Sequence, residues 1–135
     1  MQNAPAALLA RIATWPAPAQ HALWTCRARF HDIAKRDDIG PLDEALKWNQ
    51  PSWRPRRPRT GSTLRLLWDE QQPGDLAFFV DCKTDIAARM QHLYPDLPAN
   101  DGRRRIAVSL AAPLPDDAIS HLAEMTFCYH RAPRI

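Results

Sequence analysis

Several residues in this sequence combine aromatic rings with a few polar groups, which is the composition of a pocket for a small ligand. Within this set Arg65 and Lys83 would suit an anion, because their positive charges and N–H groups make charge-assisted hydrogen bonds. The alternative is that the same side chains hold the fold together, since buried Trp and Tyr normally hydrogen-bond through their polar atoms. The predicted ligand-binding residues are Trp48, Gln50, Ser52, Ser62, Thr63, Arg65, Lys83, Tyr129 and His130.

Carboxylates gather between residues 32 and 44, where they could converge on a cation. Hard cations prefer oxygen ligands, and ferrous iron accepts carboxylate and imidazole, so weak Fe²⁺ binding is one hypothesis for this cluster. The alternative, which we favour, is a solvated acidic surface in which Asp38 or Asp43 caps a helix. The acidic residues are Asp32, Asp37, Asp38, Asp43 and Glu44.

Arginines crowd the stretch between residues 54 and 59. Such a loop could bind RNA or DNA in a salt-sensitive manner, with Trp48 and Trp53 stacking on bases. We favour a solvated loop beside two core tryptophans, because no nucleic-acid motif is present and the net charge is only +3. Nucleic-acid binding would require one basic face that joins this loop to Arg103–Arg105. The loop arginines are Arg54, Arg56, Arg57 and Arg59.

The cysteines, Cys26, Cys82 and Cys128, are odd in number and widely spaced, which is typical of reduced thiols in a cytosolic protein. Cys82, Cys128 and His130 are ligand types that zinc or iron accepts, but no C-x-x-C or H-x-x-x-H spacing occurs. Cys82 follows an inward-facing strand pattern and Cys128 belongs to an apolar helix, so we expect both to be buried structural thiols.

Catalysis has little support in the sequence. Nucleophilic hydrolysis needs a base within hydrogen-bond reach of a Ser or Cys, oriented by a third group. Ser62, His130 and Asp81 are the only candidates we find, and nothing in their spacing requires them to meet. No G-x-S-x-G, phosphate-binding loop or dinucleotide fingerprint is present. We therefore predict a protein that is not an enzyme.

The bulk properties indicate one domain spanning residues 1–135. No apolar run approaches the ~20 residues that cross a bilayer, and the first residues lack the basic region of a secretory signal. The expectation is a soluble, cytoplasmic protein with no membrane partner.

Hydrophobic periodicity predicts helices first. Residues 4–14 can form a short helix, and residues 19–36 carry an apolar stripe of Leu23, Cys26, Phe30 and Ile33. Residues 42–48 are expected to form one or two helical turns. Residues 50–53 have a proline at their second position, Pro51, which predicts an edge strand or the beginning of a strand.

Strands and two further helices follow. Residues 64–69 and 76–82 alternate in polarity, which predicts an antiparallel hairpin with one buried face. A helix is predicted over residues 85–94, with Thr84 as its candidate N-cap. Residues 105–110 alternate in polarity and predict a further strand, and a last helix is expected to begin near Asp116. This order indicates an α+β fold in which helices cover one face of an antiparallel sheet of about four to six strands.

Four segments also resemble a known family. KWNQPSW at 47–53, GSTLRLLW at 61–68, FFVDCKTDI at 78–86 and FCYHR at 127–131 are similar to the YdhG-like family of bacterial proteins, over residues 20–131. The resemblance implies a frataxin-like sandwich, and some members of the wider family are described as iron chaperones. Frataxins bind iron through an acidic ridge on the first helix, whereas here no acid precedes Asp32. The resemblance therefore implies the fold more strongly than an iron role.

The sequence favours a non-enzymatic binding or chaperone-like module for a small anionic ligand. Weak iron binding and RNA or DNA binding through the arginine loop are the alternatives, and only the first of these two draws on the family. Because Trp53 is expected on an edge strand and exposed edges pair readily, a homodimer also stays open.

Overall fold

The computed structural model describes residues 4–97 and 99–131, and it confirms the predicted α+β class. In the helices the apolar residues recur every three or four positions, and in the strands they recur every second position. These are the spacings that place apolar side chains on one side of each element. The elements are α1 (Ala6–Ile12), α2 (Ala17–Arg36), β1 (Leu42–Lys47), β2 (Gln50–Pro55), β3 (Leu64–Leu67), β4 (Asp75–Phe79), α3 (Ile86–Leu93), β5 (Arg105–Ser109) and α4 (Asp116–Phe127).

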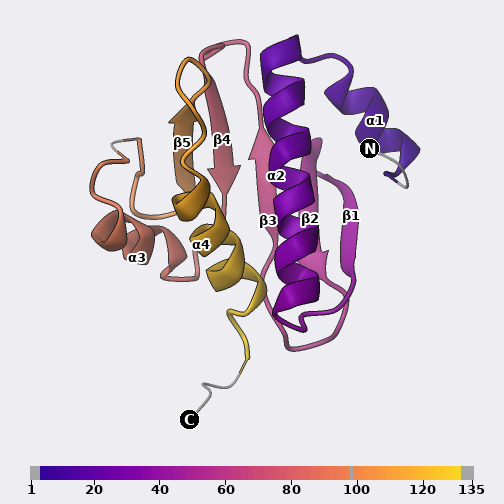
Figure 1. The fold of residues 1–135 in the computed structure, drawn as a ribbon, viewed down its shortest axis with the longest axis vertical. Coiled ribbons are helices and arrows are strands. Elements are labelled where there is room, and N and C mark those ends of the chain that lie inside the picture. The colour runs from indigo at the N-terminus through magenta and orange to yellow at the C-terminus, as the bar shows by residue number, and fades with distance from the viewer. Residues whose placement is uncertain (1–3, 98, 132–135) are drawn as a thin grey trace.

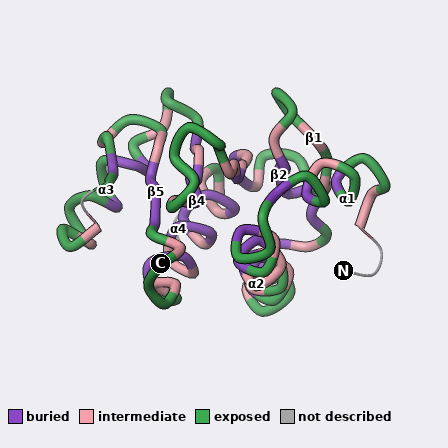
Figure 2. The backbone as a smooth tube through the Cα atoms, turned by 90° about the horizontal axis from the view of Figure 1, so that it is seen from above, coloured by how far each residue is buried: buried purple, intermediate pink, exposed green. Residues whose placement is uncertain are grey.

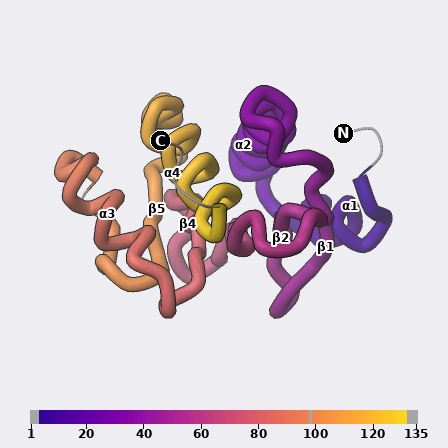
Figure 3. Tube along the Cα trace, turned by 90° about the horizontal axis from the view of Figure 1, so that it is seen from below, coloured from indigo at the N-terminus to yellow at the C-terminus, as the bar shows by residue number. Residues whose placement is uncertain are grey.

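The strands form one five-stranded antiparallel sheet in the order β1-β2-β3-β4-β5 (Figure 1). Helices α2 and α4 lie side by side on one face of this sheet, as the views from above and below show (Figures 2 and 3). No described helix covers the other face, which we call the open face. The sheet therefore has one packed face and one face available for contact with other molecules.

The packed face is a dense aromatic and aliphatic core. The ring of Phe30 on α2 lies edge-on between Trp53 and Phe127, with ring centroids 5.1 and 5.8 Å away. Such edge-to-face pairs add to the stabilisation that burial alone provides. Gly61 lets the chain before β3 approach α4 closely, since a Cβ there would lie 2.1 Å from the Phe127 carbonyl oxygen.

Two sequence predictions near the N-terminal half were wrong. Residues 42–48 do not form helical turns, because Leu42–Lys47 pairs along its whole length with β2. LDEALK has good helix formers, and tertiary pairing overrides that preference. Consequently β1 is the edge strand and β2 lies inside the sheet, where Trp53 is fully buried. The edge position of Trp53, from which a homodimer was inferred, is therefore wrong, while the homodimer itself stays a prediction.

The interior position of β2 is compatible with its two prolines because its ladder with β3 is short. Only Ser52 and Trp53 pair with β3, opposite Arg65 and Leu64. Pro51 and Pro55 lie outside that ladder, so their missing N–H groups cost no hydrogen bond to β3.

In the part of the chain that the structure describes, no helix is both long and apolar enough to cross a membrane.

Candidate functional site

The predicted ligand-binding residues do not form a single pocket. Trp48 and Gln50 lie at the turn between β1 and β2, and Ser52 and Arg65 pair on the open face. A third group lies at the opposite end of the sheet, beside the end of α4 (Figure 1). There the Ser62 amide donates to the Thr126 carbonyl at 2.8 Å. The remaining members of that group are Thr63, Lys83, Tyr129 and His130, where the Tyr129 hydroxyl accepts from the Asp85 amide and the His130 amide donates to the Thr60 carbonyl.

A row of directly paired residues crosses the open face from β1 to β5. Successive strand partners are Ala45, Ser52, Arg65, Phe79 and Arg105. Residues directly opposite in antiparallel strands are near neighbours on one face. Arginines therefore flank Phe79 on both sides, and the Arg65 guanidinium carbon lies 5.5 Å from the Phe79 ring centroid.

The two arginines of this row are held by neutral acceptors. Arg65 Nη1 donates to Gln50 Oε1 at 3.1 Å, and Arg105 Nη2 donates to Gln72 Oε1. Partial burial lowers the pKa of Arg65, and the nearby Arg104 lowers it further while Asp81 opposes the change. Among the described residues neither Arg65 nor Arg105 forms an ion pair with a carboxylate. Their positive charges are thus only weakly compensated by the protein.

A hollow of about 390 Å³ adjoins the row at its β5 end. Its lining includes the apolar residues Leu67, Ala77 and Phe79 together with Gln72 and Arg105. The carboxylates of Asp69 and Asp75 also line it, although neither is within ion-pair distance of Arg105. Sequence reasoning found Gln50, Ser52 and Arg65 but missed Phe79 and Arg105. The available signal was that Phe79 is an aromatic residue out of phase with the inward-facing Leu76 and Phe78.

The acidic residues predicted to hold a cation face basic side chains instead. Asp43 Oδ1 lies 2.7 Å from Arg56 Nε, and Asp38 Oδ1 lies 3.6 Å from Arg57 Nη1. Within residues 4–97 and 99–131 no three His, Cys, Asp or Glu side chains converge as a metal site would require. Of the other three acids in the predicted cluster, Asp37 pairs with Arg36 and Glu44 pairs with Arg27. Asp32 is exposed on α2. Two of the loop arginines, Arg56 and Arg57, therefore have acidic partners. All four loop arginines are exposed.

Glu44 is the most strongly perturbed of these acids. It points to the packed face, where burial would raise its pKa, but hydrogen bonds from Arg27, Trp53 and His31 outweigh burial and lower it to about 2. Arg27 Nη2 and Trp53 Nε1 each lie 2.8 Å from a Glu44 oxygen, and His31 Nε2 lies 3.3 Å away. With its charge satisfied in this way, Glu44 has the environment of a structural ion pair rather than of a metal ligand.

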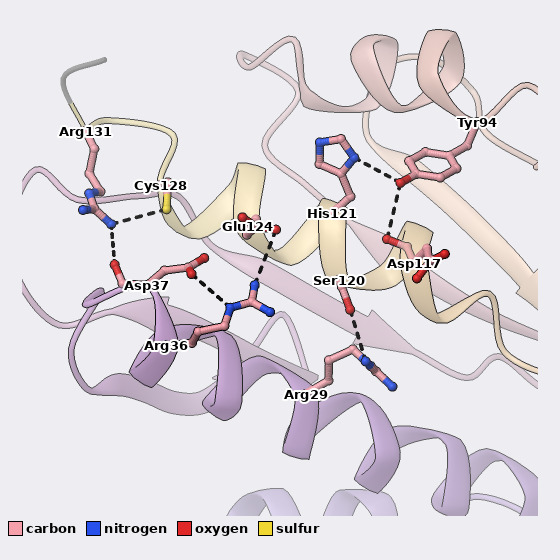
Figure 4. Close-up of polar contacts among 10 residues, drawn as sticks. All are labelled: Arg29, Arg36, Asp37, Tyr94, Asp117, Ser120, His121, Glu124, Cys128 and Arg131. Atoms are coloured by element: carbon pink, nitrogen blue, oxygen red, sulfur yellow. Dashed lines mark hydrogen bonds and ion pairs between the residues drawn. The ribbon is translucent and has the colours of Figure 1, made fainter. Parts of the chain in front are cut away.

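Polar contacts between α2, α3 and α4 form a second cluster, drawn in Figure 4. Arg29 reaches Ser120, Arg36 reaches Glu124, and the Tyr94 hydroxyl lies 3.1 Å from His121 Nδ1. These contacts join neighbouring helices. No Ser or Cys among them lies beside a His or carboxylate base, and the Tyr94 hydroxyl that meets His121 also lies within hydrogen-bond distance of the Asp117 carbonyl, so we assign them to packing.

The cysteine predictions are corrected in part. Cys82 is exposed rather than buried, because β4 ends at Phe79 and Cys82 belongs to the following loop. Cys128 is half-buried; burial raises the pKa of its thiol, although Arg131 opposes this shift. Cys128 is therefore a poor thiolate, as expected of a structural cysteine. No hydrogen bond described in the structure joins Ser62 to His130 or Asp81.

Comparison with known proteins gave no match to a family model, to a curated protein or to a solved structure. The resemblance to the YdhG-like family stays a prediction from four sequence segments.

Proposed function

We propose that this protein is a non-enzymatic binding module whose open face takes a small oxyanion, a phosphate or a carboxylate, between Arg65 and Arg105. The observation that carries the proposal is the row Arg65–Phe79–Arg105, in which arginines on β3 and β5 lie on either side of Phe79 on β4. Among the described residues neither arginine forms an ion pair with a carboxylate.

Guanidinium chemistry supports an oxyanion as the ligand. The planar N–H fork of arginine matches carboxylate and phosphate oxygens and can donate two parallel hydrogen bonds. Arg65 and Arg105 each donate one side-chain hydrogen bond, to the neutral amides of Gln50 and Gln72. The remaining donors are free to bind a ligand, and the glutamines orient the forks without cancelling their charge.

Binding suits this row better than catalysis does. It offers hydrogen-bond donors and an aromatic ring but no Ser, Cys or carboxylate positioned to attack a substrate. Ser52 is the only hydroxyl in the row, and it donates to the Ala45 carbonyl at 3.2 Å without any base beside it.

The proposal is tested by adding inorganic phosphate to isotope-labelled protein at constant ionic strength and following amide NMR signals. We expect shifts in β3, β4 and β5 around Arg65, Phe79 and Arg105, and we expect them to be absent in the variant Arg65→Gln/Arg105→Gln. Lys35→Gln/Arg89→Gln is the matched control, since Lys35 on α2 and Arg89 on α3 are both exposed and the variant loses the same two charges. Shifts that persist in the double variant would contradict the proposal.

Nucleic-acid binding is a second candidate because one further arginine shares the open face. Arg54 lies two positions beyond Ser52 on β2 and is exposed, so it extends the row toward the arginine loop. A bound RNA or DNA would contact several of these arginines, and its affinity would fall steeply with added salt. A single-stranded oligonucleotide that binds no more tightly than inorganic phosphate would exclude this candidate.

A further inference from the structure

A second hollow, of about 530 Å³, lies at the end of the sheet where α1 meets the β1–β2 turn and the loop after β3. Indole rings and charged side chains dominate its wall. The residues that matter to the argument are Trp15, Trp48, Trp68, Arg11, Asp69 and Glu70. We call it the tryptophan cavity. Its volume is in the range of pockets that hold small organic ligands.

Trp48 is held in an unfavourable conformation beside this cavity. It and Asn49 have positive φ angles of 55° and 61°, so they form the two-residue turn of the hairpin. Such turns prefer Asn and Gly at these positions, and a bulky side chain in the left-handed region is disfavoured. The Trp48 side chain is nevertheless 78% exposed. Strained, exposed aromatic residues of this kind gather at binding sites.

Trp15 contributes an unsatisfied donor to the same wall. The residue is only 3% exposed, and its Nε1 has no hydrogen-bond partner. Buried indole N–H groups normally find an acceptor. Trp68 differs, because its Nε1 donates to the Pro73 carbonyl at 3.0 Å. An acceptor on a ligand would complete the contacts of Trp15.

Opposite charges line the cavity without neutralising each other. Arg11 on α1 donates from Nε to the Asn49 carbonyl and from Nη1 to Thr14 Oγ1. Asp69 and Glu70 belong to the loop after β3, on a different wall. Within residues 4–97 and 99–131 none of these three residues forms an ion pair.

We propose that the tryptophan cavity binds a zwitterion that carries a methylated ammonium group and a carboxylate. The ammonium group would lie against the indole faces of Trp48 and Trp68 near Asp69 and Glu70, since tryptophan is the best cation–π partner and quaternary ammonium ions are its usual ligands. The carboxylate would face Arg11. The Trp15 N–H is buried in the free protein, so it would reach the carboxylate only through a shift of the indole ring. The cavity adjoins the arginine row, since Gln50 lines it and also accepts from Arg65, and Leu67 and Asp69 line both hollows. The two proposals invoke different cationic groups and different ligands, so phosphate binding and zwitterion binding can each fail without the other.

Three probes of similar size separate the contributions of the two charges. Glycine betaine carries both charges, 3,3-dimethylbutanoate has the same shape without the positive charge, and choline lacks the carboxylate. NMR signals of the indole N–H groups report binding at each tryptophan. We expect glycine betaine to shift the Trp15 and Trp48 signals with a dissociation constant at least ~10-fold below that of either partner probe.

Variants of exposed residues keep the fold intact while testing the charges. Asp69→Asn/Glu70→Gln should weaken glycine betaine binding by about tenfold and leave 3,3-dimethylbutanoate unaffected. Asp96→Asn is the control, because Asp96 is an exposed acid outside the cavity wall. Equal binding of glycine betaine and 3,3-dimethylbutanoate, or of glycine betaine and choline, would overturn the proposal. So would the absence of any indole shift at tens of millimolar probe.

Discussion

Charged side chains have different partners on the two faces of the sheet. On the packed face the Glu44 carboxylate accepts hydrogen bonds from Arg27 and Trp53, and its pKa is lowered to about 2. On the open face Arg65 and Arg105 are held by neutral glutamines. Compensation of charge is what a buried structural ion needs. The arginines of the open face have no such carboxylate partner among the described residues, which is why we propose a binding role for them.

The largest effect on the packed face is expected from Trp53→Ala. Trp53 is fully buried, packs edge-on against Phe30 and donates to Glu44. Its removal should lower the free energy of unfolding by about 4 kcal/mol, because it leaves a cavity and an incomplete carboxylate shell. Denaturant unfolding measures this value, and a loss below ~1 kcal/mol would contradict the packing described for this face.

Glu44→Gln tests the ion pair itself. It leaves Arg27 buried without its carboxylate, so we expect the free energy of unfolding to fall by about 3 kcal/mol. Asp43→Asn is a matched control on the same strand, since the pair of Asp43 with Arg56 is exposed and should contribute less than ~1 kcal/mol. Equal losses for the two variants would mean that the faces do not differ as we describe.

Acid should remove the contribution of Glu44 progressively. The pKa of Glu44 is lowered on folding from its ordinary 4.5 to about 2, so its stabilisation is complete above pH 4.5 and is lost as the pH falls toward 2. The loss should be of order 2 kcal/mol, allowing for partial solvent screening. Unfolding curves of the wild-type protein and Glu44→Gln should therefore converge in this pH range, and a constant difference between them would contradict the assignment.

Trp48→Gly should act in the opposite direction to Trp53→Ala. Glycine adopts the positive φ of this turn without strain, so the free energy of unfolding should rise by about 1 kcal/mol. The same change should abolish binding of glycine betaine. Thermal unfolding and the indole titration together measure both effects, and a destabilised protein would show that Trp48 serves the fold.

The smallest effect on stability is expected from Arg65→Gln. Among the described residues the Arg65 side chain makes one hydrogen bond, to Gln50, and a cation–π contact with Phe79, and it forms no ion pair. The free energy of unfolding should therefore change by less than ~0.5 kcal/mol. Phosphate affinity should fall about tenfold, because a charge-assisted contact is lost. A large loss of stability would show that Arg65 stabilises the fold, as Arg27 does, and would contradict a role in binding alone.

Most elements could be predicted from hydrophobic period, but the site could not. The apolar residues on one side of α2 and the alternating polarity of β3 and β4 are local patterns that the sequence shows directly. Strand β1, in contrast, consists largely of residues that favour helices, and it is a strand because it pairs with β2. The row on the open face exists only once the register sets Arg65 opposite Phe79 and Phe79 opposite Arg105. Register depends on contacts between distant segments, so the sequence pattern alone could not bring these three residues together.

The most direct test of the account follows the Nε–H signals of arginine during addition of phosphate at constant ionic strength. We predict that the signals of Arg65 and Arg105 shift together with a common dissociation constant, while Arg27, which is paired with Glu44, does not respond. Shifts shared equally by all arginines, or confined to the arginine loop, would contradict an oxyanion site on the open face.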